Sequence, residues 1–170
     1  LVPRDCKLFL GPKYALLRPE FKMLRESSLF KKRFGKLRRI LINFGGGDKL
    51  NLTEKVLKSL SQIKLPVEFQ IHVILGPQAV LDENISSFKD VFCGKIKISQ
   101  NIKNMGEAMV NADLAISAGG STSWERCALG LPSMIFSVAD NQKKITENIA
   151  GRKAGVSLTE VSLSNGEFEH

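Results

Sequence analysis

Histidine is almost absent from this sequence of 170 residues, which contains only His72 and His170. A Ser-His-Asp or Cys-His mechanism needs a histidine base, so the chain has almost no material for nucleophilic catalysis of that kind. His72 stands in the apolar run QIHVIL, a setting that favours a histidine packed on a strand over a catalytic one. If the protein is an enzyme that needs a histidine base, that base lies elsewhere, and we assign no catalytic residue here.

Cysteine is also scarce, and long apolar runs are missing. Cys6, Cys93 and Cys127 are an odd number at wide spacings without a CxxC pair, so neither disulfides nor a zinc site is predicted. A reducing cytosol is the natural compartment for such a chain. No apolar run approaches the roughly 20 residues of a membrane-spanning helix. With 43% hydrophobic residues, the composition indicates a globular domain. We predict no metal site and no cofactor.

Positive charge is plentiful. The net charge is +8, which favours anionic partners such as phosphates, nucleic acid or acidic membranes. Much of it lies in KKRFGKLRR, residues 31–39. This run is typical of a solvated connector beside a strand, and the alternative is a nucleic-acid-binding stripe. Apart from Phe34 it has no aromatic platform, and no helix-turn-helix, KH or RRM signature occurs, so nucleic acid is the weaker alternative.

The order of apolar runs and helical patterns predicts the fold class. Strands are expected at 38–44, 67–75, 95–99, 113–117, 132–138 and 156–158. Helices are expected at 18–34, 51–63, 105–112, 121–129 and 141–155, whereas the mixed segment up to Asp90 carries no predicted element. The strands are apolar on both faces, which is typical of a parallel sheet covered by helices. We therefore predict an α/β, Rossmann-like, doubly wound parallel sheet.

Two predicted helices begin with capping signals. Asn51 and Glu54 have capping-box spacing, and so have Thr122 and Glu125. In the first of these helices, five apolar residues are predicted to share one face: Leu52, Val56, Leu57, Leu60 and Ile63.

Two glycine loops, FGGGD (44–48) and SAGGSTS (117–123), each follow a predicted strand and precede a predicted helix. Both should therefore lie at the same edge of the sheet. Glycine there lets the backbone approach a ligand, and the following helix presents unpaired N–H groups, which together form an anion site, usually for phosphate. Neither loop matches GxGxxG or GxxxxGK[ST], which disfavours a classical NAD site and a P-loop ATPase.

Glu125 has two interpretations at this stage. In one, it closes a capping box with Thr122 and binds no ligand. In the other, its two acceptor oxygens receive hydrogen bonds from the neighbouring hydroxyls of a ribose.

Five segments resemble a known family: GPKYALLRPEF (11–21), FGGGD (44–48), AM-x-x-AD-L-A-I (108–116), AGGSTSWERCALGLPS (118–133) and ADNQ (139–142). Together they resemble the C-terminal half of the pseudaminic acid pathway hydrolase, which acts on UDP-2,4-diacetamido-2,4,6-trideoxy-β-L-altropyranose. The resemblance spans nearly the whole chain. More distantly, the chain is similar to the UDP-binding half of GT-B glycosyltransferases of the MurG type.

This resemblance implies two Rossmann-like domains with the UDP-sugar in the cleft between them. Residues 1–37 would be an interdomain linker with a helical segment, and residues 38–170 would form the C-terminal, UDP-binding domain. The family's N-terminal domain, which carries the histidine base, is absent from this chain. The implied reaction is hydrolysis with loss of UDP and release of the free amino sugar, so this chain would bind UDP without turnover.

The resemblance also implies which residues contact the ligand. The second loop would bind the diphosphate through Gly120, Ser121, Thr122 and Ser123, and the first loop would line the phosphate side with Gly45, Gly46 and Gly47. Glu125 would hold the ribose. The uracil would meet Asn101, Ile102 and Met105. The sugar would face Tyr14, Arg18, Asp140, Asn141 and Gln142, although anchoring of the linker is an equal alternative for Tyr14 and Arg18.

Two departures from the family pattern bear on these implications. Gly47 stands where a serine is expected, which removes a possible hydroxyl donor. The chain also ends at NGEFEH, short of the family's final helical segment. A glycosyltransferase of GT-B type, which would share the fold and the nucleotide site, remains the alternative function.

Overall fold

The computed structural model describes residues 2–9, 11–81, 83–93 and 95–159. Within these residues the chain forms one sheet of six parallel strands in the order β3-β2-β1-β4-β5-β6. The strands are β1 (Arg39–Asn43), β2 (Gln70–Leu75), β3 (Ile96–Gln100), β4 (Leu114–Ala118), β5 (Ser133–Phe136) and β6 (Val156–Leu158). Helices cover both faces, so the predicted Rossmann-like, doubly wound fold is confirmed.

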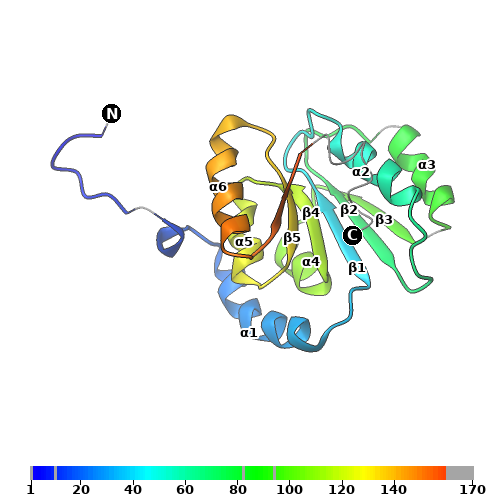
Figure 1. The fold of residues 1–170 in the computed structure, drawn as a ribbon, viewed down its shortest axis with the longest axis horizontal. Helices are drawn as coiled ribbons and strands as arrows, with labels where there is room; N and C mark the ends of the chain where they lie inside the picture. Colours follow the sequence, from blue (N-terminus) through cyan, green and yellow to red (C-terminus); the bar gives the residue numbers. More distant parts are fainter. Residues whose placement is uncertain (1, 10, 82, 94, 160–170) are drawn as a thin grey trace.

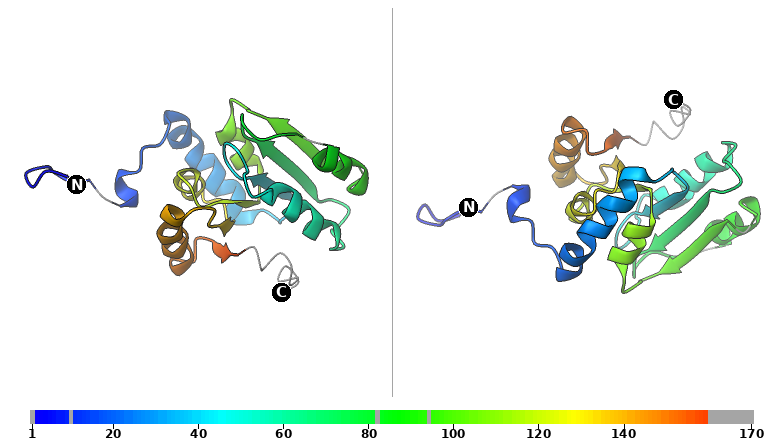
Figure 2. Two further views of the ribbon diagram at one scale, coloured as in Figure 1. Left: turned by 90° about the horizontal axis from the view of Figure 1, so that it is seen from above. Right: turned by 90° about the horizontal axis from the view of Figure 1, so that it is seen from below.

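The helices divide between the two faces of the sheet (Figures 1 and 2). Helices α2 (Leu52–Ser61) and α3 (Glu83–Val91) pack on one face. The other face carries α1 (Pro19–Phe34), α4 (Met105–Asn111) and α5 (Thr122–Ala128), and α6 (Asp140–Gly151) lies beside β6. None of the helices in the described residues is long and apolar enough to cross a membrane.

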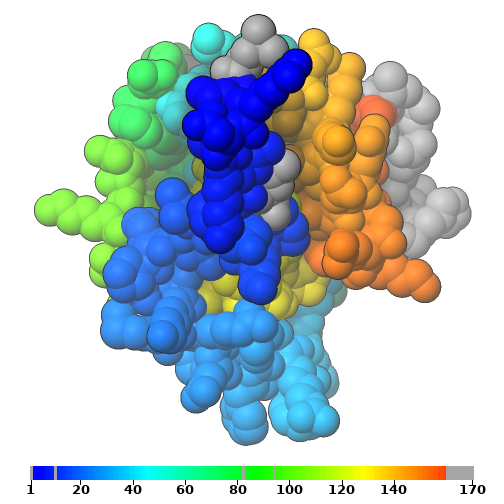
Figure 3. Space-filling model, turned by 90° about the vertical axis from the view of Figure 1, so that its left-hand side faces the viewer, coloured from blue at the N-terminus to red at the C-terminus, as the bar shows by residue number. Residues whose placement is uncertain are grey.

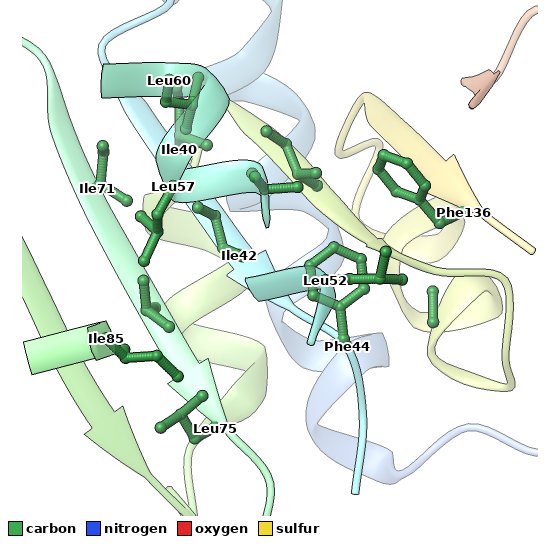
Figure 4. Close-up of a cluster of buried hydrophobic side chains, with 14 of the residues drawn as sticks. Ile40, Ile42, Phe44, Leu52, Leu57, Leu60, Ile71, Leu75, Ile85 and Phe136 are labelled. Carbon is green, nitrogen blue, oxygen red and sulfur yellow. The ribbon is translucent and has the colours of Figure 1, made fainter. Parts of the chain in front are cut away.

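The larger hydrophobic cluster lies between the sheet and α2 (Figure 4). As predicted, one face of α2 is buried, with Leu52, Val56, Leu57 and Leu60 at most 4% exposed. Ile63, beyond the end of the helix, is only partly buried against the same cluster. On the opposite face, a second cluster joins Phe21 of α1 to Leu41 of β1 and to residues of α4. These two layers fix the sheet that carries the glycine loops.

The first predicted capping box is wrong. Asn51 has a left-handed backbone, with φ of 52°, and makes no side-chain cap. Instead, the Asp48 carboxylate accepts hydrogen bonds from the amides of Leu52 and Thr53, both at 2.9 Å. The aspartate that ends the FGGGD loop therefore caps α2, which ties the position of the loop to the first turn of the helix.

Helix α3 is an element that the sequence did not predict. Its apolar residues are few, because polar and charged side chains fill most of the nine positions of ENISSFKDV. Only Ile85 is buried, while Phe88 and Phe92 pack against the core from the partly exposed side. The spacing of these three residues, i, i+3 and i+7, is the helical signal that the mixed composition conceals.

Part of the basic run 31–39 is engaged inside the fold. The Lys32 ammonium group donates to Ser28 Oγ and to the carbonyls of Met109 and Val110 at the end of α4. Burial lowers the pKa of Lys32 to about 8, even though the nearby Asp113 carboxylate acts in the opposite sense. Lys31 donates to Asn111. These two cations hold α1 against α4, so the start of the run belongs to a packed helix and not to the solvated connector that was predicted.

His72 packs on a strand, as predicted. It is half-buried on β2, and its Nε2 lies 3.0 Å from Ser99 Oγ of β3. Burial and the charge of Lys97 lower the pKa of His72. His170 lies outside the described residues. Residues 2–9 and 11–17 precede α1 and include a short 3-10 helix, η1 (Pro12–Tyr14), and this arm extends away from the body in Figure 1.

Candidate functional site

The order of the strands reverses between β1 and β4, which are hydrogen-bonded neighbours. In doubly wound sheets, ligands bind at this switch point, beyond the carboxyl ends of the strands. The register pairs Asn43, the last residue of β1, with Ser117 of β4, one residue before that strand ends. The two glycine loops leave the sheet from these positions. The topology therefore places one loop on each side of the switch point.

The first loop is held close to the sheet by glycine. Gly45 has a φ of +82°, a conformation that favours glycine over residues with a side chain. The backbone amide of Gln78 donates to the Gly46 carbonyl at 2.9 Å, so the loop is tied to the segment after β2. A Cβ added at Gly46 would meet no atom within 4 Å, so this loop faces open space. A cavity of about 270 Å³ adjoins it, and its lining includes Gly47, Lys49 and Ala139.

The second loop lies against α6. The Gly119 amide donates to the Phe136 carbonyl at 2.9 Å, and a Cβ at Gly119 would collide with Thr146 Oγ1. Gln142 stands beside this loop, because a Cβ at Gly120 would lie 3.8 Å from its Nε2. The other end of the Gln142 amide accepts a hydrogen bond from the Val138 backbone at 3.2 Å. The structure thus brings Gln142 next to the second glycine loop.

Arg126 supports this loop from below and was missed by the sequence analysis. It is 2% exposed. Its guanidinium donates to Ser133 Oγ of β5, to the Ala118 carbonyl of β4 and to Ser123 Oγ in the first turn of α5, at 3.0, 3.2 and 3.0 Å. Burial lowers its pKa to about 10, so Arg126 remains charged at neutral pH. Nothing in the sequence distinguishes it from the many exposed basic residues.

Glu125 does not cap its own helix. Helix α5 has no side-chain cap at Ser121, so the Thr122–Glu125 capping box is wrong. The Glu125 side chain instead lies toward α1, where its Oε1 is 3.4 Å from Nη2 of Arg18. The same Arg18 nitrogen is 3.2 Å from Glu20 Oε1, so two carboxylates share one guanidinium. Glu125 Oε2 is buried and has no hydrogen-bond partner among the described residues.

The surroundings of Glu125 disfavour the ionised form of its side chain. Its side chain is 16% exposed. Burial raises the pKa of Glu125 above its usual value of 4.5, the Arg18 charge partly opposes this, and Glu20 adds to it. A half-buried acid with an unused oxygen beside a glycine loop is typical of a ligand-binding position.

This pKa shift predicts a pH-dependent stability. Because the folded-state pKa of Glu125 is raised, its protonation stabilises the fold below about pH 4.5, and this contribution is lost as the pH rises through the raised value. Urea unfolding from about pH 4.5 to about pH 7 should therefore show Glu125→Gln gaining stability relative to wild type as the pH rises. Glu147→Gln, an exposed change on α6, is the matched control. A constant difference between Glu125→Gln and wild type across this range would contradict the assignment.

Comparison with known families decides what kind of domain this is. Residues 40–159 match the model of the glycosyltransferase family 28 C-terminal domain. The chain belongs to this family. The matched range includes both glycine loops, Arg126 and Glu125, and it omits the arm and α1.

Two curated relatives are longer than this family 28 domain. An uncharacterised protein of Methanocaldococcus jannaschii, MJ1062, is 36% identical over 95% of this chain and 36% of its own length. The spore coat polysaccharide biosynthesis protein SpsG of Bacillus subtilis is 27% identical over 92% of this chain and 45% of its own length. The chain therefore spans less than half the length of either relative.

Solved structures of low identity share the fold of the family 28 domain. MurG of Acinetobacter baumannii aligns with a TM-score of 0.63 at 18% identity, over 83% of this chain and 42% of its own. WaaG, a glycosyltransferase involved in lipopolysaccharide biosynthesis, aligns with a TM-score of 0.57 at 16% identity, over 94% of this chain and 44% of its own. The rhamnosyltransferase SpnG, solved with thymidine diphosphate, aligns with a TM-score of 0.54 at 21% identity, over 81% of this chain and 36% of its own. The fold is thus that of GT-B C-terminal domains.

The residues assigned to uracil lie after β3. Asn101 has a left-handed backbone, with φ of 48°, and its amide donates to the Leu75 carbonyl at 2.9 Å. That amide is therefore engaged and would not be offered to a base. Ile102 and Met105 pack on the second hydrophobic cluster, between the turn and α4. Within the described residues, no hydrogen bond of the Ile102 backbone is found, so Ile102 is the better candidate of this turn.

The residues assigned to the sugar separate into two groups. Arg18 and Gln142 reach the site, against Glu125 and the second glycine loop. Tyr14 lies in the extended arm, where its ring packs edge-on against Phe9 at 5.2 Å. Asp140 is 94% exposed and pairs with Lys143 at 2.8 Å, and Asn141 is exposed beside it. Among the described residues, no hydrogen bond or ion pair joins these last three side chains to the glycine loops, so their assignment to the sugar stays a prediction.

Proposed function

We propose that this family 28 domain binds UDP or a UDP-sugar in the crevice between the two glycine loops. The single observation that carries the proposal is the position of the loops: both lie at the switch point, and the unpartnered oxygen of Glu125 is in the first turn of the helix that follows the second loop. A nucleoside diphosphate fits the chemistry of this arrangement, because backbone N–H groups suit the phosphates and a carboxylate suits the ribose hydroxyls.

The diphosphate is proposed to lie against backbone rather than against charged side chains. Gly45 and Gly46 leave space for close approach, and Gly47 lies beside the 270 Å³ cavity. On the other side, we assign the phosphates to Gly120 and to the start of α5, Ser121 and Thr122. Ser123 differs from them, because it is buried and accepts a hydrogen bond from Arg126. Its backbone amide is also engaged, because it donates to the Gly120 carbonyl at 3.0 Å. We therefore assign Ser123 to support of the loop and the phosphate to the residues before it.

Glu125→Ala should weaken UDP binding by about 1 to 3 kcal/mol, a fall in affinity of about 5- to 150-fold, because the ribose hydroxyls lose their acceptor. Calorimetry with UDP and its 2′-deoxy analogue measures this effect. Glu68→Gln, an exposed change just before β2, is the matched control and should leave the affinity unchanged. If Glu125→Ala binds UDP as tightly as wild type, the proposed role of Glu125 in ribose binding is wrong.

For the whole protein we propose a UDP-sugar hydrolase that releases UDP and a free 2,4-diacetamido-2,4,6-trideoxyhexose, as in pseudaminic acid biosynthesis. The quoted resemblance, which includes AGGSTSWERCALGLPS, supports this finer assignment. In this proposal residues 1–37 connect the domain to an N-terminal domain, and residues 38–170 bind the nucleotide. The catalytic base belongs to that other domain, so the chain alone should bind UDP without turnover.

A GT-B glycosyltransferase is supported about as well. The family description and the SpnG and WaaG structures are those of glycosyltransferases, and SpnG was solved in complex with a nucleoside diphosphate. A longer protein that contains this chain should be incubated with UDP-sugars, first alone and then with candidate acceptors. Free sugar and UDP formed without an acceptor support the hydrolase, whereas a glycosylated acceptor supports the transferase.

A further inference from the structure

A line of large apolar side chains covers the outer face of α1. Met23 is 76% exposed, Phe30 71% and Phe34 72%. At 100° per residue, these three lie within about 40° of one another and opposite Phe21, which is fully buried. Leu37, just after the helix, is 50% exposed and extends the line toward β1. Single apolar residues scattered over a protein surface are common, but several on the face opposite the buried one form an apolar patch, and such a patch indicates an interaction site.

Cations surround this apolar line. The Arg33 guanidinium lies 5.6 Å from the centre of the Phe34 ring, and Lys22, Lys36 and Arg38 are exposed on the same segment. The acidic residue among them is Glu26, so positive charge predominates. Unlike Lys31 and Lys32, the side chains of these four cations make no hydrogen bond or ion pair within the described residues.

The part of this surface formed by Phe30, Phe34 and Leu37 lies away from the proposed nucleotide site. Helix α1 begins beside Glu125, where Arg18 precedes its first turn, and it ends at Phe34, five residues before β1 begins. The exposed phenylalanines are therefore near the amino-terminal ends of the strands, whereas the glycine loops follow the carboxyl ends. In Figure 1 α1 runs along the lower edge of the molecule, and in Figure 3 it forms the lower end of the face shown.

We propose that the outer face of α1 is a docking surface for an anionic membrane. Met23, Phe30, Phe34 and Leu37 would enter the headgroup region, and the surrounding lysines and arginines would contact lipid phosphates. Apolar residues combined with a basic rim are what interfacial helices use to bind anionic bilayers. This binding would be peripheral and would leave the glycine loops facing away from the lipid.

Charge and geometry favour a membrane over the other occupants. A second copy of the chain would bring the same basic rim against itself, and like charges repel. Nucleic acid would need aromatic faces on which bases can stack, but Phe30 and Phe34 pack edge to face, at 67° and 5.8 Å, and Met23 and Leu37 offer no such face. A domain that closes the nucleotide crevice would approach from the opposite edge of the sheet.

Co-sedimentation with vesicles tests this inference without reference to nucleotide binding. The chain should sediment with phosphatidylcholine vesicles that contain about one-third phosphatidylglycerol, and much less with phosphatidylcholine alone. The double variant Phe30→Ser/Phe34→Ser should reduce the partition coefficient by about tenfold or more. Its melting temperature should equal that of wild type, because both side chains are exposed.

A matched double variant controls for the loss of apolar surface as such. Val80, 75% exposed, and Leu81, 46% exposed, follow β2 at the carboxyl edge of the sheet. The double variant Val80→Ser/Leu81→Ser removes these two apolar side chains and should sediment like wild type. Equal sedimentation of Phe30→Ser/Phe34→Ser and wild type would overturn the proposal. So would a lack of binding to anionic vesicles accompanied by binding to a short RNA, or a dimer in size-exclusion chromatography that the double variant abolishes.

Discussion

Arg126→Ala should lower the free energy of unfolding by about 3 to 5 kcal/mol, through loss of packing and of buried hydrogen bonds. The guanidinium joins the end of β4, the first turn of α5 and the start of β5 in one buried network. Removing it leaves a cavity and takes the donor from Ser123 and from the Ala118 carbonyl. Because these groups flank the second glycine loop, UDP affinity should fall as well.

Chemical denaturation of two further variants isolates the cause. Arg126→Lys keeps the charge but has no planar fork with which to reach three acceptors, so its stability should lie between those of wild type and Arg126→Ala. Arg152→Ala removes an exposed arginine after α6 and should change stability by less than about 0.5 kcal/mol. If Arg126→Ala and Arg152→Ala were equally stable, the buried network would not support the loop.

Gly76→Ala should destabilise the protein by about 2 to 3 kcal/mol, because the added methyl group collides with backbone. Its Cβ would lie 2.6 Å from both Cα and the carbonyl oxygen of Gly46, and closer still to the Gly45 carbonyl oxygen. Backbone atoms cannot rotate away as a side chain can, so the first glycine loop must move. That movement should also weaken the hydrogen bond from Gln78 to Gly46 and lower UDP affinity.

Gly46→Ala separates stability from binding in the same loop. Its Cβ would meet no atom within 4 Å, so thermal unfolding should be unchanged within about 0.5 kcal/mol. The methyl group would nevertheless occupy the space proposed for the phosphates, and UDP affinity should fall. Gly151→Ala, which also meets no atom within 4 Å, controls for the glycine-to-alanine change at the end of α6. If Gly76→Ala were as stable as wild type, the close packing of Gly76 against the backbone of this loop would be contradicted.

The strands and the sheet edge of both glycine loops could be predicted because their signals are local. Continuous apolar runs such as RRILINF identify buried parallel strands without reference to the rest of the chain. A glycine cluster after such a run then falls at the carboxyl edge of the sheet. The order of the strands is not a local property, and only the structure shows that β1 and β4 are neighbours at the switch point.

The contacts that depend on distant residues could not be predicted. The capping spacing of Thr122 and Glu125 is local and misleading, since Arg18, 107 residues away in the sequence, attracts the Glu125 carboxylate instead. Similarly, Asp48 takes the capping role that spacing assigned to Asn51, because the left-handed backbone at Asn51 removes its side chain from the amides. Arg126 is the clearest case, because burial alone distinguishes it from other arginines.

Backbone amide NMR of this chain during titration with UDP tests the central proposal most directly. A nucleotide site at the switch point predicts saturable shift changes concentrated in residues 45–47 and 119–125. The Glu125→Ala variant should need a higher UDP concentration to reach them. The absence of shifts at these loops, or shifts confined to residues 31–39, would contradict a nucleotide site at the switch point.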